Sequence, residues 1–366
     1  MAGAAVSGAH VLRGTADSDA RRMQSSCCGQ AQNYMSLSST TSLSGPVALA
    51  FGNEQGTCCL IESGISRNQV IPIWSASKMM TGYIFLKFVN EGRLTLETRV
   101  SQILSWWGAS GGGCRNVTIL QLLTQVGSMD TFRRGLAECD AGDVVSCAQE
   151  AYSYSCSSRP LESVFAYAET NFYVLGAIAL AVTGLPTYND VFHAYLGRPL
   201  GISASCVFNN PSIAKADPGG GCSCSIVDYA RFLRAVMAGE IVPDALRRRA
   251  ELPQTKQLGI DTGSFWWPWH YGIGQWRECP EPPGVGRPHG SITLGISRRL
   301  SANCAETDTM GMKVSSIGKA GYYPWILRKG AESHWGIVAR EGSWRPMDIS
   351  IGMGRRILPM AADAMA

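Results

Sequence analysis

One stretch of the chain decides the fold: Ile71-Pro-Ile-Trp-Ser-Ala-Ser-Lys-Met-Met80. Apolar residues recur beyond Ser75 at spacings of three and four, which predicts a helix; they are Ala76, Met79, Met80, Tyr83, Ile84 and Phe88. Phe85 and Leu86 add apolar side chains outside that stripe, so we expect the helix to be buried on most sides. Gly92 marks its end. Ser75 therefore stands where a strand-like run meets a buried helix.

Ser75 and Lys78 are three residues apart, a spacing that places their side chains on one face of a helix. Unpaired N–H groups in the first turn of the helix would face Ser75 and favour developing negative charge there. A desolvated lysine near other cations can lose its proton and activate a serine. The pair is therefore a candidate nucleophile with its base.

The spacing alone is not specific, because the chain contains it twice more, at Ser212/Lys215 and Ser316/Lys319. The first of these pairs precedes a Pro-Gly-Gly loop, and the second lies in a strand-like stretch. Only the pair at Ser75 stands at a strand-to-helix junction. Taken by itself, that pair also fits polar surface residues at the start of a helix.

Two further segments carry side chains that suit the same chemistry. Tyr167 and Glu169 come just before an apolar helix, in Phe165-Ala-Tyr-Ala-Glu-Thr-Asn-Phe-Tyr-Val-Leu-Gly176. Lys319 lies in Ser316-Ile-Gly-Lys-Ala-Gly321 at a strand edge, where glycine lets a substrate approach the backbone closely. Taken separately, Tyr167 fits a core aromatic residue and Lys319 fits a solvated charge.

The chain begins and ends with strand-like patterns and is helical between them. Apolar runs at 47–51 and 58–61, separated by a glycine-containing turn, predict a hairpin. Helices are expected over 118–125, 170–183, 187–197 and 226–239, the last with a capping box from Ser225 to Asp228. Strands are expected over 291–297, 322–328 and 334–340, with a hairpin turn at 329–332 between the last two.

This order of elements predicts an α/β (α+β) fold, in which an antiparallel β-sheet is flanked by helices and carries an inserted, mostly helical lobe. Residues 1–42 are rich in Ala, Ser, Gly and Thr without periodicity, so we expect a mobile leader there and one domain over 43–366. The sheet lobe would cover about 43–105 and 265–366, and the helical lobe about 106–264, with the site in the cleft between them.

The composition is that of a globular protein, with 45% hydrophobic and 16% charged residues. The net charge of +4 comes from 32 basic and 28 acidic residues scattered along the chain, which argues against a nucleic-acid partner. The longest apolar run, 172–182, is about half as long as a transmembrane helix requires. The N-terminus lacks an apolar core segment, so a signal peptide is not predicted.

Thirteen cysteines are a high count and an odd one. Cys27-Cys28 and Cys58-Cys59 are adjacent pairs, so we expect disulfides, and with them an oxidising compartment. The chain contains no C-x-x-C pair, and its five histidines lie far from the cysteine clusters in sequence. A metal site is therefore not predicted.

The order of the three segments resembles the pattern of the serine β-lactamase/penicillin-binding-protein superfamily, which is S-x-x-K, then Y-x-N, then K-T-G or H-x-G. The resemblance is to class C β-lactamases, D-alanyl-D-alanine carboxypeptidases and related esterases. It runs from about residue 45 to 342. Further segments similar to that family are Gly92-Arg-Leu-Thr-Leu96, Val117–Gln125, Val182-Thr-Gly184, Arg198-Pro-Leu-Gly-Ile202, Gly220-Gly221, Asp228–Leu233 and Tyr271-Gly-Ile-Gly274.

The resemblance implies acyl transfer to Ser75 followed by hydrolysis, without a metal or an organic cofactor. Lys78 and Tyr167 would share the proton transfers, as base for the attack and acid for the leaving group. The backbone N–H groups of Ser75 and Tyr322 would form the oxyanion hole. The implied partner is a small-molecule or peptide acyl substrate.

In the third motif, Lys319 with Ala320 and Gly321 would lie along the substrate and attract its carboxylate. His289-Gly290 is the alternative, but it precedes a strand-like run rather than the final hairpin, so Lys319 is preferred. The aromatic run 266–271 could form a lip for a ligand, although packing of core and rim is the simpler interpretation.

Two departures from the family pattern bear on activity. Glu169 occupies the place of the family's asparagine; an ionised carboxylate cannot donate a hydrogen bond, and beside Lys78 it favours the charged ammonium. Ala320 replaces a threonine and removes one hydroxyl. We therefore expect an altered substrate choice, with Tyr167 carrying more of the base role. The alternative is a catalytically silent relative used for binding or assembly.

Overall fold

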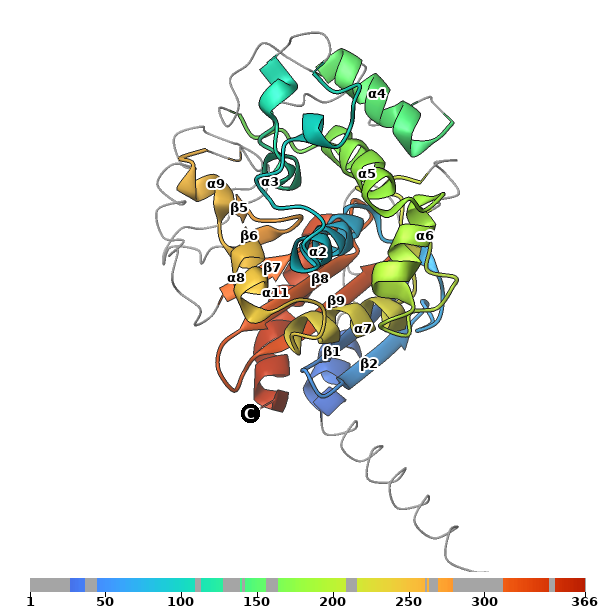
Figure 1. Ribbon diagram of the computed structural model, residues 1–366. Coiled ribbons are helices and arrows are strands. Elements are labelled where there is room, and N and C mark those ends of the chain that lie inside the picture. Colours follow the sequence, from blue (N-terminus) through green and yellow to red (C-terminus); the bar gives the residue numbers. More distant parts are fainter. Residues whose placement is uncertain are drawn as a thin grey trace, which may run out of the picture.

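The structure is a computed structural model, which describes residues 27–36, 45–108, 113–127, 139, 142–155, 164–208, 216–260, 262, 269–278, 312–341 and 346–365. Within these ranges a large antiparallel sheet stands between helices on both of its faces, and further helices lie at one end of the molecule (Figure 1). The predicted α+β class, an antiparallel sheet flanked by helices, is therefore confirmed.

The large sheet has seven described strands in the order β2-β1-β9-β8-β7-β6-β5, and every neighbouring pair is antiparallel. They are β1 (Val47–Gly52), β2 (Thr57–Ser63), β5 (His270–Tyr271), β6 (Trp276–Glu278), β7 (Met312–Ser315), β8 (Tyr323–Arg328) and β9 (His334–Arg340). The predicted hairpin is the β1–β2 pair, and β1 also pairs with β9. One sheet is thus assembled from both ends of the chain, as predicted. The expected strand 291–297 lies outside the described residues.

The sheet is buried on both faces because its central strands carry apolar side chains on both. Successive residues of a strand point to opposite faces. In β1, Ala48 and Ala50 join the core cluster that contains side chains of α2 (Ser77–Asn90) and α7 (Ile226–Met237). Leu49 and Phe51 join a second cluster with α11 (Pro346–Met365). The first cluster is the larger, and it surrounds the helix that starts beside Ser75.

The predicted helices are present, with boundaries that differ by a few residues. They are α3 (Ile119–Leu123), α5 (Glu169–Thr183), α6 (Tyr188–Phe192) with a following π-helical turn (His193–Gly197), and α7. Ser225 caps α7 as predicted, because its Oγ accepts the N–H of Asp228 at 3.1 Å. The other described helices are α4 (Val144–Ser155), α8 (Asp244–Glu251) and α9 (Gln254–Gln257), with short turns η2 (Val100–Gln102) and η3 (Gly113–Asn116).

The expected mobile leader needs a correction. Residues 27–36 are helical, and disulfides join Cys27 to Cys58 and Cys28 to Cys59 in β2. Cys28 is buried in the second core cluster. The order of this segment comes from crosslinks to a distant strand, which its own composition does not reveal. Residues 1–26 and 37–42 lie outside the described ranges, and the division into a sheet lobe and a helical lobe stays a prediction.

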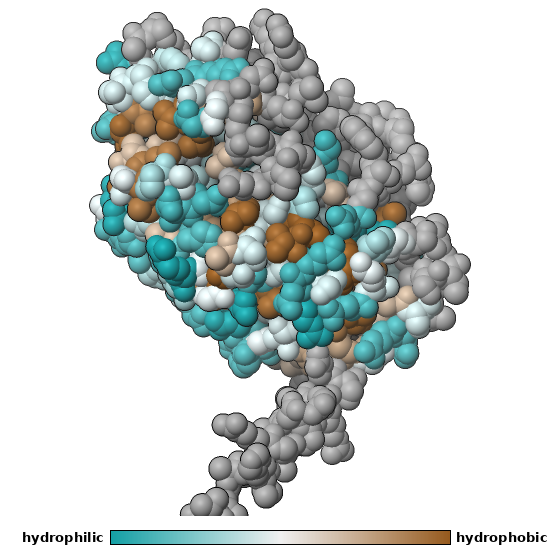
Figure 2. Space-filling model, turned by 90° about the vertical axis from the view of Figure 1, so that its right-hand side faces the viewer, coloured by the Kyte–Doolittle hydropathy of each residue, from teal (hydrophilic) through white to brown (hydrophobic). Residues whose placement is uncertain are grey.

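The surface in Figure 2 shows hydrophobic side chains in separate areas between hydrophilic ones. Among the described residues, the exposed large hydrophobic side chains are those of Val70, Val164 and Leu258. In the same ranges, no helix by itself combines the length and hydropathy that crossing a bilayer requires; α5 and the α6 segment meet both criteria only when taken together, across a bend of 71°.

Candidate active site

Ser75 lies in a one-turn 3-10 helix, η1 (Trp74–Ala76), between the short strand β3 (Ile71–Pro72) and α2. Trp74 has a φ of +52°, a left-handed conformation that a bulky residue rarely adopts. The hydroxyl of Ser77 donates to the carbonyl oxygen of Trp74 and accepts the N–H of Cys222 at 3.1 Å. The turn that presents Ser75 is therefore strained and is held by neighbouring bonds, an arrangement that is common at functional sites.

Lys78 is fully buried one turn beyond Ser75. Its Nζ donates to Ser75 Oγ at 3.2 Å, to Glu169 Oε1 at 3.0 Å and to the carbonyl oxygen of Gly219 at 2.7 Å. An ammonium group has three hydrogens, and these three bonds use all of them. Burial alone would lower the pKa of Lys78, but the negative charges around it, Glu169 first, outweigh burial and raise the pKa above its ordinary value. The surroundings of Lys78 therefore favour its charged form, in which its Nζ donates to Ser75 Oγ.

Tyr167 lies beside Lys78 within a cluster of aromatic rings. The Nζ of Lys78 is 4.8 Å from the centroid of the Tyr167 ring. The Tyr167 ring also stacks on the Trp276 ring, with 5.3 Å between the ring centroids. It meets the Tyr271 ring edge to face, with 5.8 Å between the centroids. Aromatic contacts of this kind restrict the orientation of a ring. The aromatic residues of this cluster thus fix the Tyr167 ring beside Lys78.

Gln125 holds the backbone on both sides of Tyr167. Its carbonyl oxygen accepts the N–H of Ala166 at 2.9 Å, and its side-chain Oε1 accepts the N–H of Ala168 at 2.6 Å. Gln125 is fully buried and has a φ of +60°. In the sequence Gln125 ends the family-like segment Val117–Gln125, where nothing indicates a role for it. Only the folded structure shows that residues 125 and 166–168 pair.

The third segment, residues 316–321, lies against the turn that carries Ser75. The hydroxyl of Ser316 donates to the carbonyl oxygen of Ser75 at 2.9 Å, and the N–H of Gly318 donates to the carbonyl oxygen of Tyr322 at 2.7 Å. A Cβ on Gly318 would lie 2.2 Å from the carbonyl oxygen of Ile73, so only glycine fits. Lys319 is exposed, and its Nζ lies 5.9 Å from the centroid of the Trp74 ring.

The structure therefore brings the residues of all three sequence segments together. Lys78 contacts both Ser75 and Glu169 through hydrogen bonds, and the ring of Tyr167 lies beside Lys78. The turn that contains Lys319, Ala320 and Gly321 packs on the residues that precede and include Ser75, and the Tyr322 side chain is fully buried behind it.

Asp217 is a residue of this site that the sequence analysis missed. Only 1% of it is exposed. Its Oδ1 accepts the N–H of Gly219 at 2.7 Å, and its carbonyl oxygen accepts the N–H of Gly221 at 2.8 Å. Burial first, and then the negative charge of Glu169, raise the pKa of Asp217 to about 7. An aspartate before Pro-Gly-Gly-Gly looks like an ordinary turn residue, so the sequence contains no signal for this environment.

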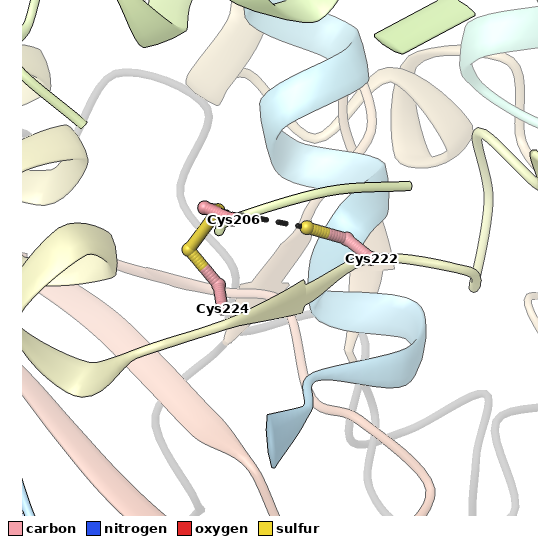
Figure 3. Close-up of side chains that lie close together, drawn as sticks. All are labelled: Cys206, Cys222 and Cys224. Carbon is pink, nitrogen blue, oxygen red and sulfur yellow. Dashed lines mark hydrogen bonds between the residues drawn. A yellow bond between two sulfur atoms is a disulfide. The ribbon is translucent and has the colours of Figure 1, made fainter. Parts of the chain in front are cut away.

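A group of three cysteines lies where the same loop continues into β4 (Ser223–Cys224), which pairs with β3 (Figure 3). Cys206 and Cys224 form a disulfide, and the Sγ of Cys222 lies 3.9 Å from that of Cys206. All three are fully buried. Because two of the sulfurs are bonded to each other, only Cys222 retains a thiol. The disulfide Cys206–Cys224 stabilises the segment that holds the turn at Ser75.

A sequence model of one family, described as Beta-lactamase, matches residues 62–278, which is more than half of the chain. The chain belongs to the Beta-lactamase family. The resemblance seen in the sequence is thereby confirmed, and the matched range contains Ser75, Lys78, Tyr167 and Glu169, but not Lys319.

Individual relatives are distant. Penicillin-binding protein 4 of Amycolatopsis lactamdurans is 24% identical over 257 residues, which cover 59% of this chain and 65% of that protein. The chain thus matches less than two thirds of the length of that relative. The fold is similar to an octameric penicillin-binding-protein homologue from Pyrococcus abyssi (TM-score 0.66, 16% identity, 91% of this chain and 77% of that one). It is also similar to EstCE1, a hydrolase with promiscuous acyltransferase activity (TM-score 0.65, 15% identity, 96% and 99%).

Proposed function

We propose that this protein is a serine hydrolase that cleaves an ester or amide through an acyl-enzyme on Ser75. The observation that carries the proposal is the 3.2 Å hydrogen bond from the buried ammonium of Lys78 to Ser75 Oγ, at the head of a buried helix. A surface serine–lysine pair has no reason to be desolvated in this way, because burying a charge costs free energy unless it is paired and hydrogen-bonded.

In the proposed reaction Tyr167 acts as a phenolate, with the ammonium of Lys78 facing its ring. Ser75 Oγ attacks the carbonyl carbon of the substrate, and the proton of the serine hydroxyl goes to the phenolate oxygen of Tyr167. The backbone N–H groups of Ser75 and Tyr322 stabilise the oxyanion. Tyr167 then donates the proton to the leaving group as the carbonyl–leaving-group bond breaks. Water hydrolyses the ester on Ser75 by the same route in reverse. Tyr167 takes the base role because Lys78 is already protonated and donates all three of its hydrogens.

The substrate we propose is a small molecule or peptide whose acyl part carries no acid next to Glu169. The carboxylate of Glu169 is partly exposed and stands beside the nucleophile, where it repels a negatively charged acyl group. The exposed ammonium of Lys319 at the other side of Ser75 attracts a carboxylate placed along the strand. β-Lactams and D-peptides fit less well, since Glu169 cannot donate the hydrogen bond that the family's asparagine supplies.

A catalytically silent relative used for binding or assembly is the second candidate. It is favoured by one observation, the salt bridge of 3.0 Å between Lys78 and Glu169, which holds the lysine in its charged form. In that form Lys78 cannot accept the proton of the Ser75 hydroxyl, so it cannot act as the base for the attack.

Intact-mass analysis distinguishes the two candidates. The protein is exposed to a fluorophosphonate, a panel of β-lactams and reporter esters, and a covalent adduct is expected from the fluorophosphonate and from at least one ester. Ser75→Ala should lose the adduct, because it removes the nucleophilic oxygen. The control is Ser153→Ala, at an exposed serine in α4, which should label like the wild type. Absence of an adduct from every probe would identify the silent relative.

Glu169→Asn should raise the turnover of β-lactams or D-peptides. The change restores a hydrogen-bond donor and removes the negative charge that keeps Lys78 protonated. We expect kcat/KM to rise at least about tenfold, which corresponds to about 1.4 kcal/mol in the barrier. Glu240→Asn, at a surface residue paired with Arg234, should leave kcat/KM unchanged and serves as the control. An unchanged kcat/KM in Glu169→Asn would count against this account of the departure from the family pattern.

A further inference from the structure

Three charged side chains from different elements meet behind Ser75. Lys78 comes from α2, Glu169 from α5 and Asp217 from the loop before β4. Among the described residues, the other titratable groups that interact with these three are Tyr167, Tyr188 and Tyr271. Burial raises the pKa of Tyr188 and of Tyr271, so both are neutral. Two carboxylates thus face a single ammonium, with Lys78 and Asp217 buried and Glu169 partly exposed.

The two carboxylates converge on the backbone of Gly220. The position that a Cβ on Gly220 would take lies 2.9 Å from Asp217 Oδ2 and 3.6 Å from Glu169 Oε1. If both were ionised, the group would carry a net negative charge with Asp217 almost completely buried. Like charges that close in a medium of low dielectric cannot both ionise freely. One bound proton makes the three groups neutral together.

Asp217 also fixes the loop that receives Lys78. Its Oδ1 holds the N–H of Gly219, whose carbonyl oxygen accepts from Lys78 Nζ. The preceding carbonyl, of Pro218, accepts from the hydroxyl of Thr81 at 2.7 Å. Two successive carbonyls of the loop are therefore bound by side chains one turn apart on α2. A change in the charge of Asp217 therefore affects Lys78, the residue whose Nζ donates to Ser75 Oγ.

We propose that Asp217 is a positioning residue that shares one proton with Glu169, and that this shared proton makes Ser75 competent for acylation. The inference rests on the proposed function, because it concerns the same nucleophile. With the proton bound, the three groups are neutral together, and no net negative charge faces the developing oxyanion. When the proton leaves, the added negative charge opposes the oxyanion at the transition state and holds Lys78 more firmly as an ammonium.

The direction of the pH dependence follows from these charges. The pKa of Asp217 is raised to about 7, so the shared proton is bound below that pH and lost above it. Both effects of its loss slow acylation. We therefore compare the acylation rate of Ser75 in the wild type with the rate in a variant that lacks one of the two carboxyl groups. The ratio of the wild-type rate to the variant rate should be highest below pH 7.

The first test follows the rate at which a fluorophosphonate labels Ser75 between pH 5 and 9 in the wild type, Asp217→Asn and Glu169→Gln. The ratio of each variant rate to the wild-type rate should rise about tenfold for each pH unit above 7. Above that pH the wild-type group loses its proton, whereas Asp217→Asn has no carboxyl to lose it from and Asp217 in Glu169→Gln is already ionised. Taking the ratio cancels the titration of groups that all three proteins share. Glu240→Gln should give a constant ratio. A constant ratio for Glu169→Gln as well would overturn the proposal.

The second test does not depend on activity and so separates this inference from the proposed function. The carboxyl carbon of aspartate is labelled with ¹³C, and Asp217→Asn identifies the resonance of Asp217. Its titration midpoint should lie near pH 7 in the wild type and move down by about one pH unit or more in Glu169→Gln, since the neighbouring negative charge is gone. An unmoved midpoint would overturn the shared proton even in a protein that no probe labels. Should Asp217→Asn fail to fold, its resonance is identified with Asp217→Glu.

Discussion

Lys78→Met should abolish most of the reactivity of Ser75, with a fall of about 10²- to 10⁴-fold in its rate of labelling by a fluorophosphonate. The substitution removes the donor to Ser75 Oγ and leaves Glu169 and the Gly219 carbonyl without their partner. Removing one member of a buried ion pair also costs about 3 kcal/mol of stability, since the other charge stays desolvated. Glu169 retains some contact with solvent, which keeps the cost at the lower end of the usual range.

A double variant separates the two effects of Lys78→Met. Lys78→Met with Glu169→Gln removes both charges, so its urea midpoint should return most of the way to the wild-type value. Its labelling rate should stay as low as in the single variant. Labelling within about threefold of the wild type in either protein would show that Lys78 has no part in activating Ser75. If the double variant recovered both its stability and its labelling rate, Lys78 would likewise have no part in activating Ser75.

Gly318→Ala should reduce the labelling of Ser75 by about 100-fold, the effect of a misplacement of about 1 Å at a reacting group. A Cβ at this position meets backbone atoms, namely the carbonyl oxygen and carbon of Ile73 at 2.2 and 3.1 Å. Because backbone cannot rotate away, either the third segment or the turn at Ser75 must shift. The shift affects the site directly, since Ser316 holds the carbonyl oxygen of Ser75.

The matched control for Gly318→Ala is Gly352→Ala, within α11 on the other side of the sheet. A Cβ on Gly352 would meet nothing within 4 Å, so the substitution should keep full labelling and gain up to about 1 kcal/mol from better helix propensity. Equal labelling rates for the two variants would show that the close contact between Gly318 and Ile73 does not position the nucleophile.

Local patterns predicted the elements around Ser75 because each has a short-range physical cause. The stripe of apolar residues after Ser75 gave the buried helix α2, and Ser225 gave the start of α7 through its cap. The strand 334–340 was predicted to the residue because its short length and the turn before it favour a buried strand over a helix. The proximity of Ser75 and Lys78 follows from helix geometry alone.

The features that sequence analysis missed all depend on contacts between distant parts of the chain. Asp217 and Gln125 have ordinary local sequences, and their roles arise from packing against residues 40 or more positions away. The left-handed Trp74 is imposed by the turn between two elements. The resemblance to a family brought Tyr167 and Lys319 into the site, yet the charge state of Lys78 depends on the burial and neighbours that only the folded chain defines.

The paired bridges from residues 27–36 to β2 have a mechanical consequence. In the chain-entropy account, a bridge that closes a loop of 31 residues contributes about 3–4 kcal/mol by restricting the unfolded chain. The second bridge closes a loop that the first has already closed, so it adds little in that account. What it removes is rotation: a segment attached at one point can swivel, whereas attachment at two neighbouring points fixes its direction. The orientation of residues 27–36 relative to β2, the outermost described strand at one edge of the sheet, is therefore fixed by the two bridges together.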